Sequence, residues 1–122
     1  MPGSMEARLS IRIDLPGGRR VGPGKIRLLE LIDETGSISA AARAMAMSYR
    51  RAWLLVESLN TGFREPVVDA QSGGRHGGGA RLTPFGRDLV RRYRALERDA
   101  ARAVDGQVDA ITDALAPREP GR

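Results

Sequence analysis

The residues best suited to contact another molecule are two arginines that follow a helix-capping serine. Ser48 precedes Tyr49, Arg50 and Arg51, which places two guanidinium groups in the first turn of a predicted helix. Cations are unfavourable there because the helix dipole already puts positive charge at a helix N-terminus. An anionic partner that offers phosphates and base edges would offset this effect. The alternative is a helical hairpin whose arginine face is simply solvated.

The distribution of charge along the chain also favours an anionic partner. The 122 residues carry a net charge of +5, and residues 37–94 hold ten arginines against four acidic side chains. A basic protein attracts nucleic acid, anionic lipid or acidic protein through its electrostatic field. Because the positive charge is concentrated in the middle of the chain, it surrounds the two arginines described above.

Few residues could serve enzyme or metal chemistry. The chain has no cysteine and a single histidine, His76, and it shows no nucleophile–base pair. Asp105, Asp109 and Asp113 repeat at helical spacing, and a solvated helix face explains them better than a cation site. We therefore expect no catalysis and no cofactor. With no long apolar run and no signal peptide, we expect a cytoplasmic, nucleoid-associated protein without membrane contact.

Three predicted helices position the arginine pair. Apolar periodicity predicts a helix over residues 25–35, whose wide apolar stripe indicates burial on two sides. Ser39 is expected to begin a second helix over residues 40–46, and Ser48 to cap a third over residues 49–59.

The second and third helices fit a helix-turn-helix over residues 37–60. Small side chains at residues 40–42 let the second helix approach its neighbours closely. In this motif the second helix of the pair enters the major groove of DNA. We therefore expect residues 48–60 to be the recognition helix, with Trp53 packed at the edge of the contact between the first and third helices.

Two short strands and a glycine-rich tip follow the recognition helix. Residues 66–71 and 80–83 have the pattern of strands, and the tip at 72–79 contains five glycines together with Arg75 and His76. A nucleotide-binding glycine loop joins a strand to a helix, whereas this tip joins two strands. We expect a wing that lies along the DNA backbone or minor groove; the alternative is an inert flexible turn.

The sequence predicts a short strand near the N-terminus of the chain and a long helix near its C-terminus. Residues 9–15 alternate apolar and polar side chains, and residues 19–21 are placed to pair back with them. Thr83 is expected to cap a helix that runs to about residue 115, with Gly106 as its weakest point. The apolar stripe of this helix is longer than one small domain can cover, so we expect a second copy of the chain to cover the rest.

Several of these segments together resemble a known family. Residues 36–42, 48–53, 73–80 and 82–86 are similar to the N-terminal winged-helix domain of the ModE-type molybdate-responsive regulators, which share their helix-turn-helix with LysR-type regulators. The resemblance implies a homodimer joined through the first and last helices, which represses or activates at a palindromic operator. The family's molybdate-binding domains follow this region, so we expect no molybdate site in these 122 residues and leave the effector open.

The expected fold is mainly α-helical: a winged helix-turn-helix with a small β-hairpin wing and a long C-terminal helix. We expect one domain over residues 9–116, with a dimerisation helix at 84–116 and flexible tails at 1–8 and 117–122. The residues expected at double-stranded DNA are Ser37, Ser39, Ser48, Tyr49, Arg50, Arg51, Arg75, His76 and Arg81. The residues expected at the homodimer surface are Leu28, Leu31, Leu89, Tyr93, Leu96, Val104, Val108 and Ile111.

A sequence-specific transcriptional regulator explains these features best. A nonspecific architectural protein that coats the nucleoid would have the same charge pattern, and steep salt dependence without a preferred site would favour it. A third possible function is that of a protein-interaction module, which would bind another protein through the long helix and not bind DNA. A stable protein complex without any DNA shift would favour that third function.

Overall fold

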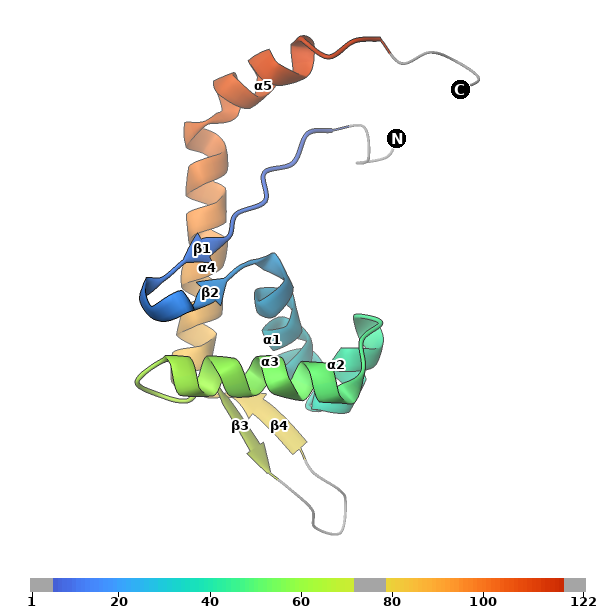
Figure 1. The fold of residues 1–122 in the computed structure, drawn as a ribbon, viewed down its shortest axis with the longest axis vertical. Coiled ribbons are helices and arrows are strands. Elements are labelled where there is room, and N and C mark those ends of the chain that lie inside the picture. Colours follow the sequence, from blue (N-terminus) through green and yellow to red (C-terminus); the bar gives the residue numbers. More distant parts are fainter. Residues whose placement is uncertain (1–5, 72–78, 118–122) are drawn as a thin grey trace.

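The computed structural model describes residues 6–71 and 79–117 of the chain. Its helices are α1 (Pro23–Thr35), α2 (Ile38–Ala44), α3 (Tyr49–Gly62), α4 (Pro84–Ala103) and α5 (Asp105–Asp113), with a short 3-10 turn at Pro16–Gly18. Its strands form two antiparallel hairpins, β1 (Ile13–Asp14) with β2 (Arg20–Val21) and β3 (Val68–Gln71) with β4 (Gly79–Leu82). This is the predicted mainly helical winged helix-turn-helix. Figure 1 shows α3 lying across the molecule, with the β3–β4 wing on one side and α4 rising on the other.

The core is built around α1, which is buried on two sides as its wide apolar stripe predicts. Ile26, Leu28, Leu29 and Ile32 are fully buried, and α1 contacts α2, α4 and β4. The small side chains of α2 are buried too, which lets α2 pack closely between α1 and α3. The first helix therefore holds the helix-turn-helix, the wing and the long helix together.

Serine caps set the start of both helices of the helix-turn-helix. The Ser48 Oγ accepts a hydrogen bond from the Arg51 N–H at 3.0 Å, and α3 begins at Tyr49 as predicted. The prediction for α2 is wrong by two residues, because Ser37 and not Ser39 is the cap: its Oγ accepts from the Ala40 N–H at 3.0 Å. Ser39 instead lies within the first turn of α2.

The N-terminal strand is shorter than the alternating pattern predicts. Only Ile13–Asp14 pair with Arg20–Val21, so the predicted return pairing is confirmed but a strand over residues 9–15 is not. The partner strand ends because Gly22 caps α1 and Pro23, which has no N–H to donate, follows it. Residues 6–12 extend away from this hairpin, toward the end of the molecule that is far from the wing (Figure 1).

The long C-terminal helix is interrupted. Thr83 caps it as predicted, but α4 ends at Ala103, and Val104 adopts φ −110° and ψ 10° before α5 begins. The break therefore comes two residues before Gly106, in a stretch where a β-branched residue and a glycine both lower helix propensity. Figure 1 shows α5 bent away from the axis of α4. Within residues 6–71 and 79–117, every helix is too short or too polar to cross a membrane.

Candidate nucleic-acid interface

The recognition helix α3 buries one face and exposes the other. Ala52, Val56 and Leu59 are buried against the core, as their spacing predicts. The opposite side carries exposed Arg50, and next to it Trp53 keeps 42% of its surface exposed. The apolar contact with the core is made by the smaller side chains of α3, and the place of Trp53 at the edge of the α1–α3 contact stays a prediction.

The two flanks of α3 face different parts of the molecule. Residues three, four or seven apart share one side of a helix, so Tyr49, Trp53 and Asn60 lie along one flank. That flank faces the wing, since Asn60 bonds to the start of β3. Arg51 and Leu55 lie along the other flank, where they line a pocket at the beginning of α1. Any molecule that binds the outer face of α3 lies between these two structures.

Asn60 connects the recognition helix to the wing. Its Oδ1 accepts hydrogen bonds from the Val67 N–H at 2.8 Å and the Val68 N–H at 3.0 Å, and its Nδ2–H donates to the Val68 carbonyl at 3.1 Å. The sequence pattern places residue 60 only at the end of the predicted helix-turn-helix, whereas α3 continues to Gly62. An amide side chain between a helix end and a strand was the available signal, because it can satisfy free backbone groups on both sides.

The first turn of α4 holds the wing from the other side. The Thr83 N–H donates to the Val67 carbonyl at 3.0 Å, and the Thr83 hydroxyl donates to the Pro66 carbonyl at 2.7 Å. The Gly86 N–H in turn donates to Thr83 Oγ1 at 2.9 Å. A Cβ on Gly86 would lie 2.1 Å from the Val67 oxygen, so only glycine fits this close approach. The base of the wing is thus fixed between α3 and α4.

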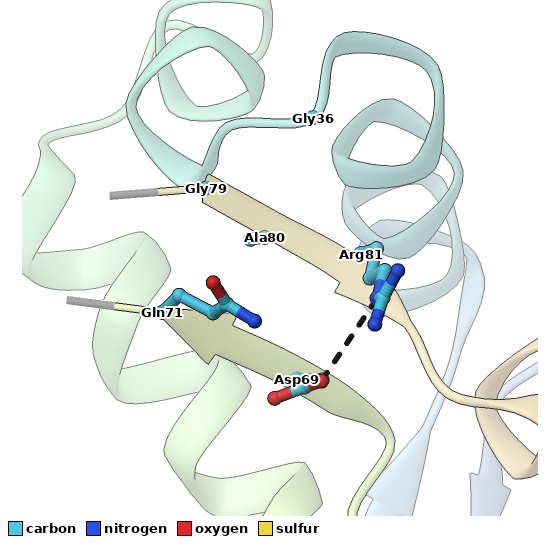
Figure 2. Close-up of a pocket in the computed structure, with 6 residues that line it drawn as sticks. All are labelled: Gly36, Asp69, Gln71, Gly79, Ala80 and Arg81. Carbon is cyan, nitrogen blue, oxygen red and sulfur yellow. Dashed lines mark ion pairs between the residues drawn. The ribbon is translucent and has the colours of Figure 1, made fainter. Parts of the chain in front are cut away.

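The wing also meets the turn before α2. The Ala80 N–H donates to the Gly36 carbonyl at 2.9 Å, which brings β4 next to the residues that begin α2. Figure 2 shows Arg81 on β4 opposite Asp69 on β3, with 3.9 Å between its Nε and the Asp69 Oδ2. Both side chains are exposed, and exposed ion pairs are weak, so Asp69 leaves Arg81 available to a stronger anion.

The part of the chain from α1 to the first turn of α4 matches a known regulatory family. Residues 24–87 match the bacterial regulatory helix-turn-helix protein, lysR family. This chain belongs to the lysR family. Over 99 residues it is 42% identical to the molybdenum transport protein ModE of Azotobacter vinelandii, a match that covers 81% of this chain and 36% of that protein.

Other relatives of this lysR-family chain show the same partial coverage. It is 47% identical over 87 residues to the molybdenum-pterin-binding protein MopB of Rhodobacter capsulatus, which covers 71% of this chain and 32% of MopB. It is 33% identical over 101 residues to the DNA-binding transcriptional dual regulator ModE of Escherichia coli K12, with coverage of 83% and 38%. The chain thus spans about a third of the length of these relatives.

Most of the predicted DNA residues that the structure describes lie in two places of the lysR-type domain, the first turn of α3 and the contact between β4 and the start of α2. Tyr49, Arg50 and Arg51 occupy the first turn of α3, and Gly36, the residue before Ser37, is bonded to Ala80, the residue before Arg81. Ser48 caps α3, which is a structural role, and its contact with DNA stays a prediction. Arg75 and His76 lie outside the described residues.

The residues predicted for a dimer surface divide into two groups. Leu28, Leu31 and Tyr93 keep at most 9% of their surface exposed in a single chain, so they offer little area to a second copy, and their place in a dimer stays a prediction. The Tyr93 hydroxyl instead donates to the Ile11 carbonyl at 2.5 Å and ties down the N-terminal segment. The remaining five are partly or largely exposed: Leu89, Leu96, Val104, Val108 and Ile111.

An ion pair sets the position of α4 against α1. Arg94 donates from Nε and Nη2 to the two carboxylate oxygens of Glu30, at 3.0 and 2.8 Å, and from Nη1 to Glu97 at 2.7 Å. Hydrogen bonds from Arg94 hold the pKa of Glu30 below its usual value. A bidentate pair of this kind is directional, so it orients α4 relative to the lysR-type helix-turn-helix.

Proposed function

We propose that this protein is a sequence-specific DNA-binding transcriptional regulator whose α3 enters the major groove. The observation that carries the proposal is the outer surface of α3, where Tyr49, Arg50 and Trp53 stay exposed although the opposite face is buried. A helix about 10–12 Å wide fits a major groove about 12 Å wide. Relatives described as transcriptional regulators support the same function.

The wing is proposed to lie along the DNA backbone or minor groove beside α3. Arg81 would supply a phosphate contact from β4, and the serines at the start of α2, Ser37 and Ser39, lie close to the same strand through the Gly36–Ala80 bond. The proposal assigns Arg75 and His76 at the wing tip to further backbone contacts. Phosphate contacts of this kind position a protein on the duplex without reading its sequence.

An Arg50→Ala variant tests base readout by α3. If Arg50 reads a base, affinity for a selected operator falls by roughly five- to a hundredfold, and affinity for unrelated duplex changes much less. Gel shifts at one fixed salt concentration measure both. Arg98→Ala is a matched control, since Arg98 is exposed on α4, far along the sequence from α3. Equal, weak binding of the unaltered protein to every duplex would overturn sequence specificity and favour the architectural function.

We further propose that two copies pair through the far part of the long helix. Ile111 and Leu115 keep 69% and 71% of their surface exposed, and Leu96, Val104 and Val108 continue the apolar stripe. Dimeric helix-turn-helix proteins bind two half-sites about one helical turn apart, so such a pairing would place two copies of α3 on a palindromic operator. Light scattering at micromolar concentration is expected to give the mass of two chains; the mass of one chain would contradict the dimer.

DNA binding by these 122 residues is proposed to need no cofactor. The donors proposed at the interface are side chains of the protein itself: hydroxyls, guanidinium groups and one imidazole. Operator affinity measured with and without added molybdate is therefore expected to agree within about twofold, close to the repeatability of a gel shift. A larger change on adding molybdate would show that this chain carries an effector site.

A further inference from the structure

A pocket of about 420 Å³ lies on the flank of α3 that faces away from the wing. Four cationic side chains line it, and each comes from a different segment of the chain. Arg12 belongs to the N-terminal segment, Arg20 to β2, Lys25 to the first turn of α1 and Arg51 to the first turn of α3. The fold thus assembles at one place cations that are up to 39 positions apart in the sequence.

Little negative charge balances this cluster. Asp14 is the acidic partner, with its Oδ1 at 2.9 Å from the Arg12 Nε and 3.8 Å from the Arg20 Nε, and all three side chains are well exposed. Within the described residues neither Lys25 nor Arg51 makes an ion pair, and the Lys25 Nζ–H donates to the Arg20 carbonyl at 2.9 Å. Partial burial and, to a smaller extent, the charge of Arg20 hold the pKa of Lys25 below its usual value.

The position of the cluster relative to α3 indicates which anion it meets. Met47, Arg51 and Leu55 of the helix-turn-helix line the pocket, whereas Asn60 and the wing lie on the opposite flank. A helix that fills the major groove has a sugar–phosphate backbone along each of its two flanks. One backbone therefore lies on the wing side, and the other lies on the side of this pocket.

We propose that the pocket of Arg12, Arg20, Lys25 and Arg51 is a phosphate-binding site for the DNA backbone that borders the major groove opposite the wing. The proposal rests on the proposed function, because α3 must enter the groove to bring this backbone within reach. It adds a contact surface outside the helix-turn-helix and the wing. The surface at Gly24 leaves room for the phosphate, since a Cβ there would meet nothing within 4 Å, whereas a Cβ at Gly22 would lie 3.5 Å from the Arg12 Cγ.

The test is a double variant, Arg20→Gln with Lys25→Gln, compared with Arg98→Gln with Arg102→Gln. Both variants remove two positive charges from exposed or half-buried surface positions, but the second pair lies on α4. Loss of one phosphate contact is expected to lower the affinity for operator and for unrelated duplex alike, about tenfold at 0.1 M salt, and to make the slope of log affinity against log salt shallower by about one. The control pair is expected to leave the slope unchanged.

Phosphate ethylation interference locates the contact. In the unaltered protein, ethylation of a backbone phosphate on the side of the groove opposite the wing is expected to block binding. In the Arg20/Lys25 variant the same ethylation is expected to have no further effect. Equal slopes for the two double variants, together with unchanged interference, would overturn the proposal while leaving the DNA-binding function intact. If the unaltered protein bound no DNA at all, the proposed function itself would fail.

Free inorganic phosphate could occupy the same pocket, because it has the same chemistry as a phosphate of the DNA backbone. Inorganic phosphate titrated into the isotope-labelled protein would shift the backbone amide signals of Gly24 and Lys25 if a free anion were the ligand. Millimolar, saturable shifts in the unaltered protein, combined with an unchanged DNA salt slope in the variant, would overturn the DNA assignment in favour of a free-phosphate site. A salt slope that is shallower by about one, without saturable shifts from inorganic phosphate, supports the DNA backbone as the ligand.

Discussion

The two ends of the molecule differ in how far their apolar side chains are buried. At the α3 and wing end, apolar side chains such as Val56, Leu59 and Val67 form a core within one chain, and the apolar side chains that stay exposed, Tyr49, Trp53 and Leu54, lie on α3 beside its arginines. At the other end of the molecule, where α5 lies (Figure 1), Ile111 of α5 and Leu115 just after it are the most exposed of the large apolar residues that the structure describes. The core of the α3 and wing end is thus complete in a single chain, whereas the apolar side chains of the α5 end are covered only if another surface meets them.

The backbone at the base of the wing is tightly constrained, whereas the backbone of α5 has room for an added side chain. The wing base is held by Asn60, Thr83 and the close approach of Gly86 to Val67, so its geometry depends on several specific contacts. Around Gly106 in α5, an added Cβ would meet nothing within 4 Å. The same small substitution should therefore lower the stability of the protein at the base of the wing and leave it unchanged, or raise it, in α5.

The largest expected effect comes from placing the same methyl group at both ends. Gly86→Ala puts a Cβ against the Val67 carbonyl, and the required backbone shift is expected to destabilise the protein by about 3 kcal/mol. Gly106→Ala is expected to leave the free energy of unfolding unchanged or to raise it by up to about 1 kcal/mol, since alanine favours a helix. Urea unfolding measures both variants. Equal destabilisation by the two would contradict the difference between the ends.

Asn60→Ala is expected to have the next largest effect. It removes three hydrogen bonds and leaves the N–H groups of buried Val67 and Val68 without their acceptor, which is expected to destabilise the protein by about 2 kcal/mol. Asn60→Asp is the comparison variant, because its carboxylate keeps the acceptor for both N–H groups, although it replaces the donor by a charged oxygen beside the Val68 carbonyl. If Ala and Asp variants lose equal stability by urea unfolding, the acceptor role of Asn60 is wrong.

The features that could be predicted from the sequence depend on neighbouring residues. Ser48 and Thr83 precede helices that they cap, and the stripe of α1 shows its two buried sides, so these elements follow from local chemistry. The helix-turn-helix and its alanine-rich second helix follow for the same reason. Even here the start of α2 was ambiguous, because Ser37 and Ser39 are both good caps and Gly36, with φ +72°, ends α1 just before the first of them.

The remaining features depend on segments that are distant in sequence. The exposure of Trp53 follows from which face of α3 reaches the core, and the role of Asn60 follows from where β3 starts. The cluster of Arg12, Arg20, Lys25 and Arg51 exists only because the N-terminal hairpin packs beside α1 and α3. Sequence periodicity describes one element at a time: the spacing of Ala52, Val56 and Leu59 predicts the buried face of α3, but periodicity could not predict the role of Asn60 or the cluster of cations.

A charge placed on α5 tests whether the far end is an interface. Ile111→Asp puts a carboxylate in the centre of the exposed apolar stripe, and it is expected to weaken the proposed dimer about tenfold or more, because the charge loses hydration on association. Ala110→Asp is the control, since Ala110 is exposed on a different side of the same helix. Light scattering over a concentration series gives the dissociation constants. A dimer that tolerates both changes equally would place its interface elsewhere.

The smallest expected effect concerns the ion pair that joins the two ends. Glu30 lies on α1 and Arg94 on α4, and Glu30→Gln is expected to lower the free energy of unfolding at pH 7 by about 1 kcal/mol or less. Because Arg94 lowers the pKa of Glu30 in the folded state, the stabilisation is present above the usual glutamate pKa of about 4.3. It is lost as the pH falls through the lower folded-state pKa. Urea unfolding of both proteins between pH 7 and pH 3 should therefore show the difference shrink, and a constant difference would mean that Glu30 acts through packing alone.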